Sequence, residues 1–132
     1  MGKTIPVYKG ESQYLEDAKQ AFRGLTDDKI KKLRSISRHS SARRISDSYI
    51  DERILPTMYE YNLFTGSDYW LEGLTWLEQN IDKASELDLD KTLILLTSAL
   101  ASNEDGFGAD YWYLKGITSR LIDRLIYLHS SS

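Results

Sequence analysis

Closely spaced carboxylates come nearest to a catalytic or metal-binding pattern in this sequence. Glu86, Asp88 and Asp90 alternate, and Asp105 and Asp110 bracket a glycine-rich turn. Paired carboxylates can transfer protons or bind a hard cation. A calcium loop needs further oxygen ligands at fixed spacing, and helix caps or solvated loops explain the same residues. We therefore predict no metal site and no cofactor, and a small hydrolase built on Asp105 and Asp110 is a minor alternative.

Other catalytic signatures are missing from the sequence. There is no cysteine, which excludes disulfides, thiolate metal sites and a cysteine nucleophile. The two histidines, His39 and His129, lie far apart, and no HExxH, GxSxG or Walker pattern occurs. The first residues, MGKTIPVYKGES, have no apolar core of a signal peptide, and the longest aliphatic run is LILL at 93–96. We expect a non-enzymatic cytoplasmic protein that does not enter a membrane.

Charge is distributed unevenly along the chain, although the formal net charge is only −3. Residues 29–44 hold seven basic residues and no acid, a charge of +7, whereas residues 60–110 hold eleven acids against two lysines, a charge of −9. The basic segment could neutralise several phosphates, but it has no aromatic residue on which a base could stack. A solvated helix face is the alternative. The candidate nucleic-acid-binding residues are Lys31, Lys32, Arg34, Arg38, Arg43 and Arg44.

The stretch SISRHSSARRIS at 35–46 has the most unusual composition in the chain. It contains five serines and three arginines, and serine weakens helices. We predict a basic linker over about residues 35–46. Ser46 follows Arg43 and Arg44 with the spacing of a basophilic kinase site, but it can equally cap the next helix.

Aromatic residues are in surplus, with nine tyrosines and three tryptophans, many of them at 49–76 and 111–113. The side chains of three consecutive helical residues fan through about 200°, so those at 111–113 cannot all face one core. Exposed Tyr and Trp are the usual anchors of protein interfaces, and burial with wet polar tips is the alternative. The candidate partner-binding residues are Tyr69, Trp70, Trp76, Tyr111, Trp112 and Tyr113.

Helical spacing of apolar residues dominates the first half of the chain. Ser12 is expected to cap a first helix that Gly24 ends, and Thr26 a second with Ile30, Leu33 and Ile36 on its buried face. Ile50, Ile54, Met58 and Tyr61 form the next apolar stripe, which Pro56 should kink or restart.

The second half contains the strongest amphipathic pattern. Gly66 and Ser67 are expected to begin a helix on which the apolar residues Trp70, Leu74, Leu77 and Ile81 share one face. Asp88 should cap a central helix over 89–101, and SNEDGFG at 102–108 is the clearest break. Gly116 can separate a short helix from a terminal one. The sequence thus predicts an all-α, compact single-domain bundle of five to seven helices over residues 1–132.

The order of features from about residue 54 to residue 128 resembles an uncharacterised family of short prokaryotic domains of unknown function. The resemblance rests on PTMYEYNLF, WLEGLTWLEQ, ELDLDKTLILLTSAL, GFG and KGITSRLIDRL. One departure is that the family often has arginine before its Phe, whereas this chain has Asn103, Glu104 and Asp105. The resemblance implies a helical fold and no particular activity. The matching positions are Trp70, Trp76, Leu95, Leu96, Thr97, Phe107, Gly116, Ile117 and Leu125.

A non-enzymatic helical protein-binding module is the function that these observations favour. Its most concrete form is a phage- or mobile-element-encoded inhibitor that docks on a host nucleoprotein complex, with the acidic half able to imitate nucleic acid. The alternative is a nucleic-acid-binding module that uses residues 29–44. The sequence leaves the partner and the oligomeric state open.

Overall fold

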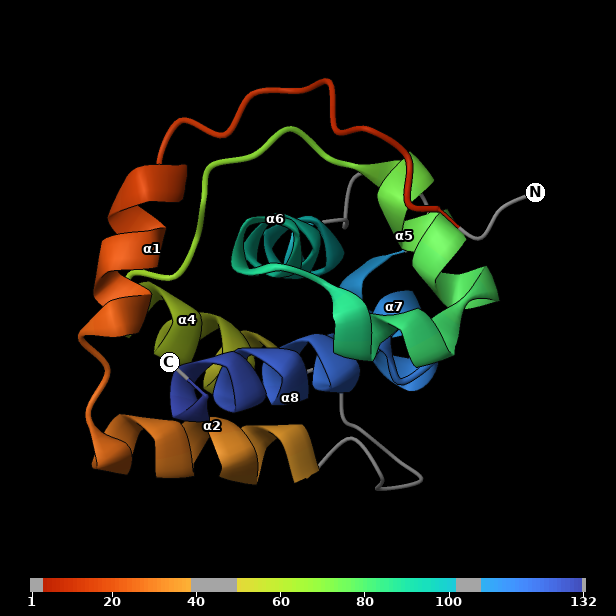
Figure 1. Cartoon of the computed structure of the whole chain (residues 1–132). Coiled ribbons are helices and arrows are strands. Elements are labelled where there is room, and N and C mark those ends of the chain that lie inside the picture. The colour runs from red at the N-terminus through yellow and green to blue at the C-terminus, as the bar shows by residue number, and fades with distance from the viewer. Residues whose placement is uncertain (1–3, 39–49, 102–107, 132) are drawn as a thin grey trace.

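Every regular element that the computed structural model describes is helical. The structure describes residues 4–38, 50–101 and 108–131. An all-α compact bundle was the predicted fold class, and this prediction is confirmed (Figure 1). Within the described parts, no helix combines the length and the apolarity needed to cross a membrane. The elements are α1 Leu15–Arg23, α2 Asp27–Arg38, the π-helical η2 Ile50–Ile54, α4 Leu55–Glu60, α5 Leu71–Gln79, the 3₁₀-helical η3 Ile81–Glu86, α6 Leu89–Leu100, α7 Gly108–Leu114 and α8 Ile117–Ser130.

Helix α6 is the central element, and the others surround it (Figure 1). All of its residues from Thr92 to Leu100 are buried, which confirms the prediction of a central helix. Its cap is also the predicted one, because the Asp88 side chain accepts a hydrogen bond of 2.8 Å from the Lys91 backbone N–H. Asp90 adds a second acid in the first turn, where the positive end of the helix dipole lies.

Helices α2 and α8 pack side by side below α6 (Figure 1). Two buried hydroxyl groups join them, since Ser37 Oγ donates to the Ser119 carbonyl at 3.3 Å and Ser119 Oγ donates to the Ser37 carbonyl at 3.2 Å. Ser37 also bonds the Asp123 carboxylate. Helix α2 includes residues 35–38, the first four residues of the segment for which the sequence predicts a linker. Residues 39–46 lie outside the described residues.

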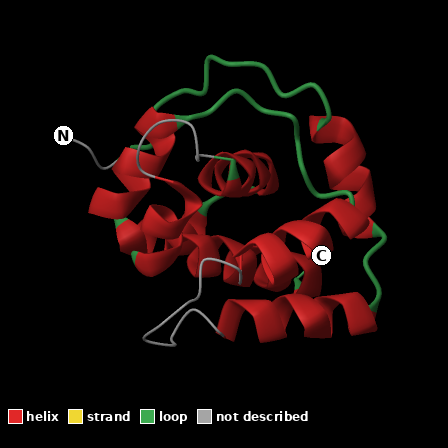
Figure 2. Cartoon of the chain, turned by 180° about the vertical axis from the view of Figure 1, so that it is seen from behind, coloured by secondary structure: helices red, strands yellow, loops and turns green. Residues whose placement is uncertain are grey.

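Two extended segments, 4–14 and 61–70, cross over α6 side by side (Figures 1 and 2). They meet at an isolated antiparallel bridge between Ser12 and Ser67, whose hydroxyls are 2.7 Å apart. Two local predictions are therefore wrong. Ser12 does not cap α1, whose N-cap residue is Tyr14, and Gly66 and Ser67 do not start a helix, because α5 begins at Leu71.

Most other helix boundaries agree with the predictions. Thr26 Oγ1 accepts a bond of 3.3 Å from the Lys29 N–H at the start of α2, and Gly24 ends α1. Pro56 lies in the first turn of α4, directly after the π-helical turn η2. Gly116 separates α7 from α8 with φ of 82°, a left-handed conformation that glycine adopts without strain.

Candidate functional site

Four of the six aromatic residues predicted as partner anchors belong to the core. The buried side chains are Trp70, Trp76, Trp112 and Tyr113. The Trp70 ring packs against Tyr8 with centroids 5.1 Å apart, and it also covers Gly73 so closely that a methyl group there would lie 2.5 Å from the indole. Burial is the alternative that the sequence left open for these rings, and it removes them from the surface available to a partner.

Tyr69 and Tyr111 are partly buried. Of the three consecutive aromatics at 111–113, Tyr111 is the one that is not fully buried. The Tyr111 hydroxyl donates to the Glu78 carboxylate, and Lys115 lies 5.4 Å from the Tyr111 ring centroid. The hydrogen bond to Glu78 raises the pKa of Tyr111, and desolvation raises it further. Tyr111 is thus tied to α5 by contacts within the fold.

The alternating acids around residue 88 have structural partners. Glu86 pairs with Lys83 at 3.2 Å and Asp90 with Lys19 at 3.1 Å. Asp88 caps α6; partial burial raises its pKa, but the bonds from the Lys91 backbone N–H and ammonium group prevail, and the net pKa is lowered. Among the residues that the structure describes, no three possible metal ligands gather. Asp105 and the side chain of Asp110 lie outside the described residues.

Three of the six candidate nucleic-acid-binding residues share the outer surface of α2. Lys31, Lys32 and Arg34 are exposed, whereas Ile30, Leu33 and Ile36 of the same helix are buried. Arg43, Arg44 and the side chain of Arg38 lie outside the described residues.

An open cavity of about 710 Å³ has three aromatic residues in its lining. Its wall contains Tyr14, Tyr59 and Phe64, which come from the N-cap of α1, from α4 and from the segment after α4. We call it the aromatic pocket. Tyr59 is 69% exposed and Tyr14 49%, although both are large aromatic residues. The Tyr59 and Phe64 rings touch, with centroids 4.4 Å apart at 45°.

A polar network fixes the wall of the aromatic pocket from behind. Tyr14 N–H donates to the Thr65 carbonyl at 2.8 Å, and Thr65 N–H donates to Thr97 Oγ1 of α6 at 3.2 Å. A further bond from this segment to α6 runs from Trp70 N–H to Ser98 Oγ at 3.1 Å. Since Thr65, Thr97 and Ser98 are buried, these bonds hold the segment 61–70 to the central helix.

The sequence contained a signal for Tyr59 that our predictions did not use. Tyr59 follows Met58, which belongs to the apolar stripe of α4, and an aromatic residue one position off a stripe must point elsewhere. Tyr14 and Phe64 had no such local signal. These two residues line the same pocket although they are 50 positions apart in the sequence. The spacing of residues within one helix cannot predict such a long-range contact.

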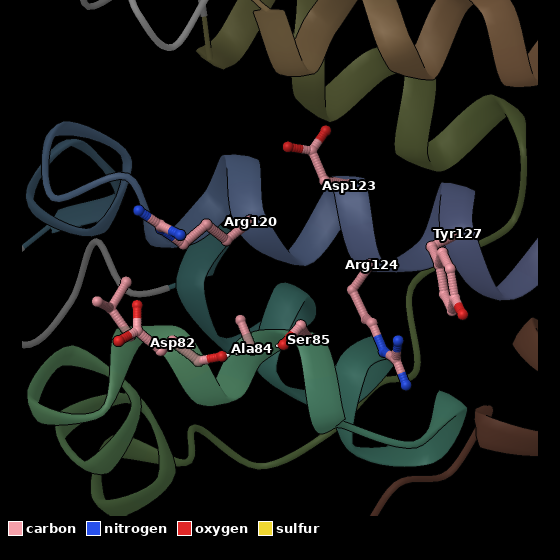
Figure 3. Close-up of a pocket in the computed structure, with 8 residues that line it drawn as sticks. Asp82, Ala84, Ser85, Arg120, Asp123, Arg124 and Tyr127 are labelled. Atoms are coloured by element: carbon pink, nitrogen blue, oxygen red, sulfur yellow. Dashed lines mark hydrogen bonds between the residues drawn. The ribbon is translucent and has the colours of Figure 1, made fainter.

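A second cavity of about 710 Å³ lies between η3 and α8, and Figure 3 shows the residues that line it. Arg124 already has two partners within the protein. Its Nε donates to the Leu87 carbonyl at 2.8 Å, and its guanidinium lies 5.1 Å from the Tyr127 ring centroid. Asp123 points toward α2 (Figure 3), where it accepts the bond from Ser37. Since Asp82 and Arg120 bring opposite charges to this cavity, it offers neither anions nor cations a uniform environment.

Comparisons with known proteins found no relative of this chain. No family model, no curated protein and no solved structure matches the chain. The resemblance to a prokaryotic family over residues 54–128 stays a prediction.

Proposed function

We propose that the chain is a non-enzymatic protein-binding module whose partner docks in the aromatic pocket. The observation that carries the proposal is the exposure of Tyr59 and Tyr14 around a cavity of about 710 Å³. Tyrosine presents a large contact area and loses little conformational entropy on binding, and for this reason it is enriched at interface hot spots. The proposed site therefore consists of other aromatic residues than those named from the sequence: Tyr14 and Phe64 in the two extended segments and Tyr59 in α4.

Binding suits this chain better than catalysis because the grouped acids that the structure describes already have structural roles. Asp88 caps a helix, while Glu86 and Asp90 are in ion pairs. A general acid or base needs a group that is free to exchange a proton with a substrate. The aromatic pocket, by contrast, is lined by Tyr14 and Tyr59, whose side chains are exposed and available for contact with a partner.

The most concrete form of the proposal is an inhibitor, encoded by a phage or another mobile element, that acts on a host nucleoprotein complex in the cytoplasm. The split charge supports this form, because the basic face of α2 and the exposed acids of α5 and η3 could orient the partner before contact. The exposed acids are Glu72, Asp82 and Glu86.

A pull-down with three variants tests the proposed function. Wild-type protein, Tyr59→Ser and Tyr127→Ser are immobilised and exposed to a lysate of the source or host cells. Tyr127 is a matched control because it is a 60% exposed tyrosine on α8, outside the aromatic pocket. We expect a stoichiometric partner on wild type and on Tyr127→Ser, and its loss from Tyr59→Ser. A partner retained by Tyr59→Ser, or no stoichiometric partner on wild type, contradicts the proposal.

Nucleic-acid binding through α2 is the second candidate, and the joint exposure of Lys31, Lys32 and Arg34 favours it. A mobility-shift assay at low and moderate salt compares wild type with a variant carrying glutamine at all three positions. The control variant carries glutamine at Lys9 and Arg23, which are also exposed. Phosphate binding predicts retardation that weakens with salt, and a salt slope that falls by about one for each contact removed. No retardation by wild type at low salt excludes this candidate.

A further inference from the structure

The charge around the aromatic pocket is of one sign. Asp17 is the only charged side chain among the described residues that line it. Asp17 is exposed and makes no ion pair with any other described residue, whereas its neighbour Glu16 pairs with Lys19 at 3.4 Å. A carboxylate without a partner at the rim attracts a positively charged group.

Three other tyrosines of this fold have a lysine or arginine side chain packed over the ring, as the two exposed tyrosines of the pocket do not among the described residues. Lys29 lies 5.2 Å from the ring centroid of Tyr61, Lys115 lies beside Tyr111, and Arg124 lies beside Tyr127. In the described parts of the chain, no lysine or arginine lies over Tyr14 or Tyr59. Since the face of an aromatic ring carries negative potential, these two rings and Asp17 favour the same kind of ligand.

The apolar and polar groups that line the pocket suit the two parts of a cationic side chain. Phe64 and Leu55, both partly exposed, supply apolar surface that can pack against the methylene groups of arginine or lysine. The Asn62 side chain also lines the pocket and has an amide oxygen that can accept a hydrogen bond. Its backbone has φ of 59°, which fixes the direction of the chain where α4 ends.

From these three features we infer that the aromatic pocket binds a cationic side chain, an arginine or a lysine, from a basic segment of the protein partner. The inference rests on the proposed function and names the chemistry of the residue that docks. Proteins that bind nucleic acid expose such residues to phosphates, so the partner class fits a nucleoprotein complex. The planar guanidinium of arginine stacks on rings and forms paired hydrogen bonds with a carboxylate, and we therefore expect arginine to bind more tightly than lysine.

An NMR titration with small probes tests this inference without knowledge of the partner. The probes are N-acetyl-arginine N-methylamide, its neutral citrulline analogue of nearly the same shape, and the norleucine analogue. We expect saturable shifts of the Tyr14 and Tyr59 ring signals with the arginine probe. Its affinity should exceed that of the citrulline probe by about threefold or more, the scale of an exposed ion pair together with a cation–π contact.

Two variants test whether the Asp17 carboxylate is the charge that binds the arginine probe. Asp17→Asn should weaken binding of the arginine probe by a similar factor, while Glu16→Gln removes one negative charge from the same helical turn and should change the affinity little. Absence of saturable shifts at Tyr14 and Tyr59 overturns the inference. Equal or tighter binding of the citrulline or norleucine probe, or an unchanged affinity in Asp17→Asn, overturns it as well.

These outcomes separate the inference from the function on which it rests. If Tyr59→Ser loses the partner while the arginine probe fails to bind, the pocket receives a neutral group and only the inference is wrong. If Tyr59→Ser also keeps the partner, the proposed function is wrong too.

Discussion

The ring of Tyr14 lies directly against Gly66, on the neighbouring extended segment. A β-carbon at position 66 would be 2.6 Å from Tyr14 Cδ2, and the backbone of Gly66 has φ of 64°. Both the contact and the conformation therefore favour glycine. Because Tyr14 is part of the aromatic pocket, this contact links a tight turn to the proposed binding surface.

Gly66→Ala should lower the free energy of unfolding by more than Gly116→Ala does. Both glycines have positive φ, so each alanine pays a conformational cost of about 1–2 kcal/mol. Only at Gly66 does the new methyl group also displace a ring, since nothing lies within 4 Å of the corresponding position at Gly116. Urea unfolding measures the difference. Equal losses for the two variants would show that the Tyr14 contact contributes nothing.

Gly73→Ala should destabilise the fold by about 1–3 kcal/mol, the usual cost of overpacking a core. The added methyl group would lie 2.5 Å from the Trp70 indole, which is buried and has little room to move. Gly24→Ala is the matched control, because its nearest neighbours would be 3.7 Å away, and we expect a change within about 0.5 kcal/mol. Denaturant unfolding followed by tryptophan fluorescence reports both variants; a harmless Gly73→Ala would contradict the packing described for α5.

Asp88→Ala should cost about 1 kcal/mol at neutral pH through loss of the α6 cap. The pKa of Asp88 is lowered in the folded protein, so the carboxylate stabilises the fold above its unfolded-state pKa. This stabilisation is lost as the pH falls through the folded-state pKa. Unfolding curves of wild type and Asp88→Ala should therefore converge in acid. The exposed Asp82 provides a control substitution to alanine, and a difference that persists in acid would argue against the carboxylate as its cause.

Glu78→Gln should lower the pKa of Tyr111 toward the ordinary tyrosine value. The hydrogen bond from the Tyr111 hydroxyl to the Glu78 carboxylate is the main cause of the raised pKa. A raised folded-state pKa means that this stabilisation is complete below the unfolded-state pKa and is lost as pH rises through the folded-state value. Ring NMR signals followed through alkaline pH give the pKa. Tyr61 is the internal control, because burial and Glu60 raise its pKa; an unmoved Tyr111 would contradict the assigned bond.

The sequence predicted those features of the fold that depend on neighbouring residues. Asp88 as the cap of α6, Thr26 as the cap of α2 and the break at Gly116 each require only a few adjacent positions. Ser12 was misread because its partner Ser67 is 55 residues away. Its short polar side chain suits a helix cap and a bridge between extended segments equally well, and only the tertiary structure decides between them.

The candidate site was harder to predict than the fold for the same reason. Periodicity indicated that one of the residues 111–113 must face outward, but it did not indicate which one, and Trp112 and Tyr113 proved to be core residues. The aromatic pocket combines α1, α4 and the end of α6. Tyr14 and Phe64 approach each other only through the pairing of two extended segments, and local spacing carries no information on that pairing.

Photo-crosslinking from position 59 tests most directly whether the aromatic pocket is the surface on which a partner docks. A benzophenone amino acid replaces Tyr59 in one protein and Tyr127 in the other, and both are irradiated in a lysate of the source or host cells. We predict one dominant crosslinked protein from position 59, reduced by Asp17→Asn and not formed from position 127. Absence of a crosslink from position 59, or the same products from both positions, would contradict the proposed function.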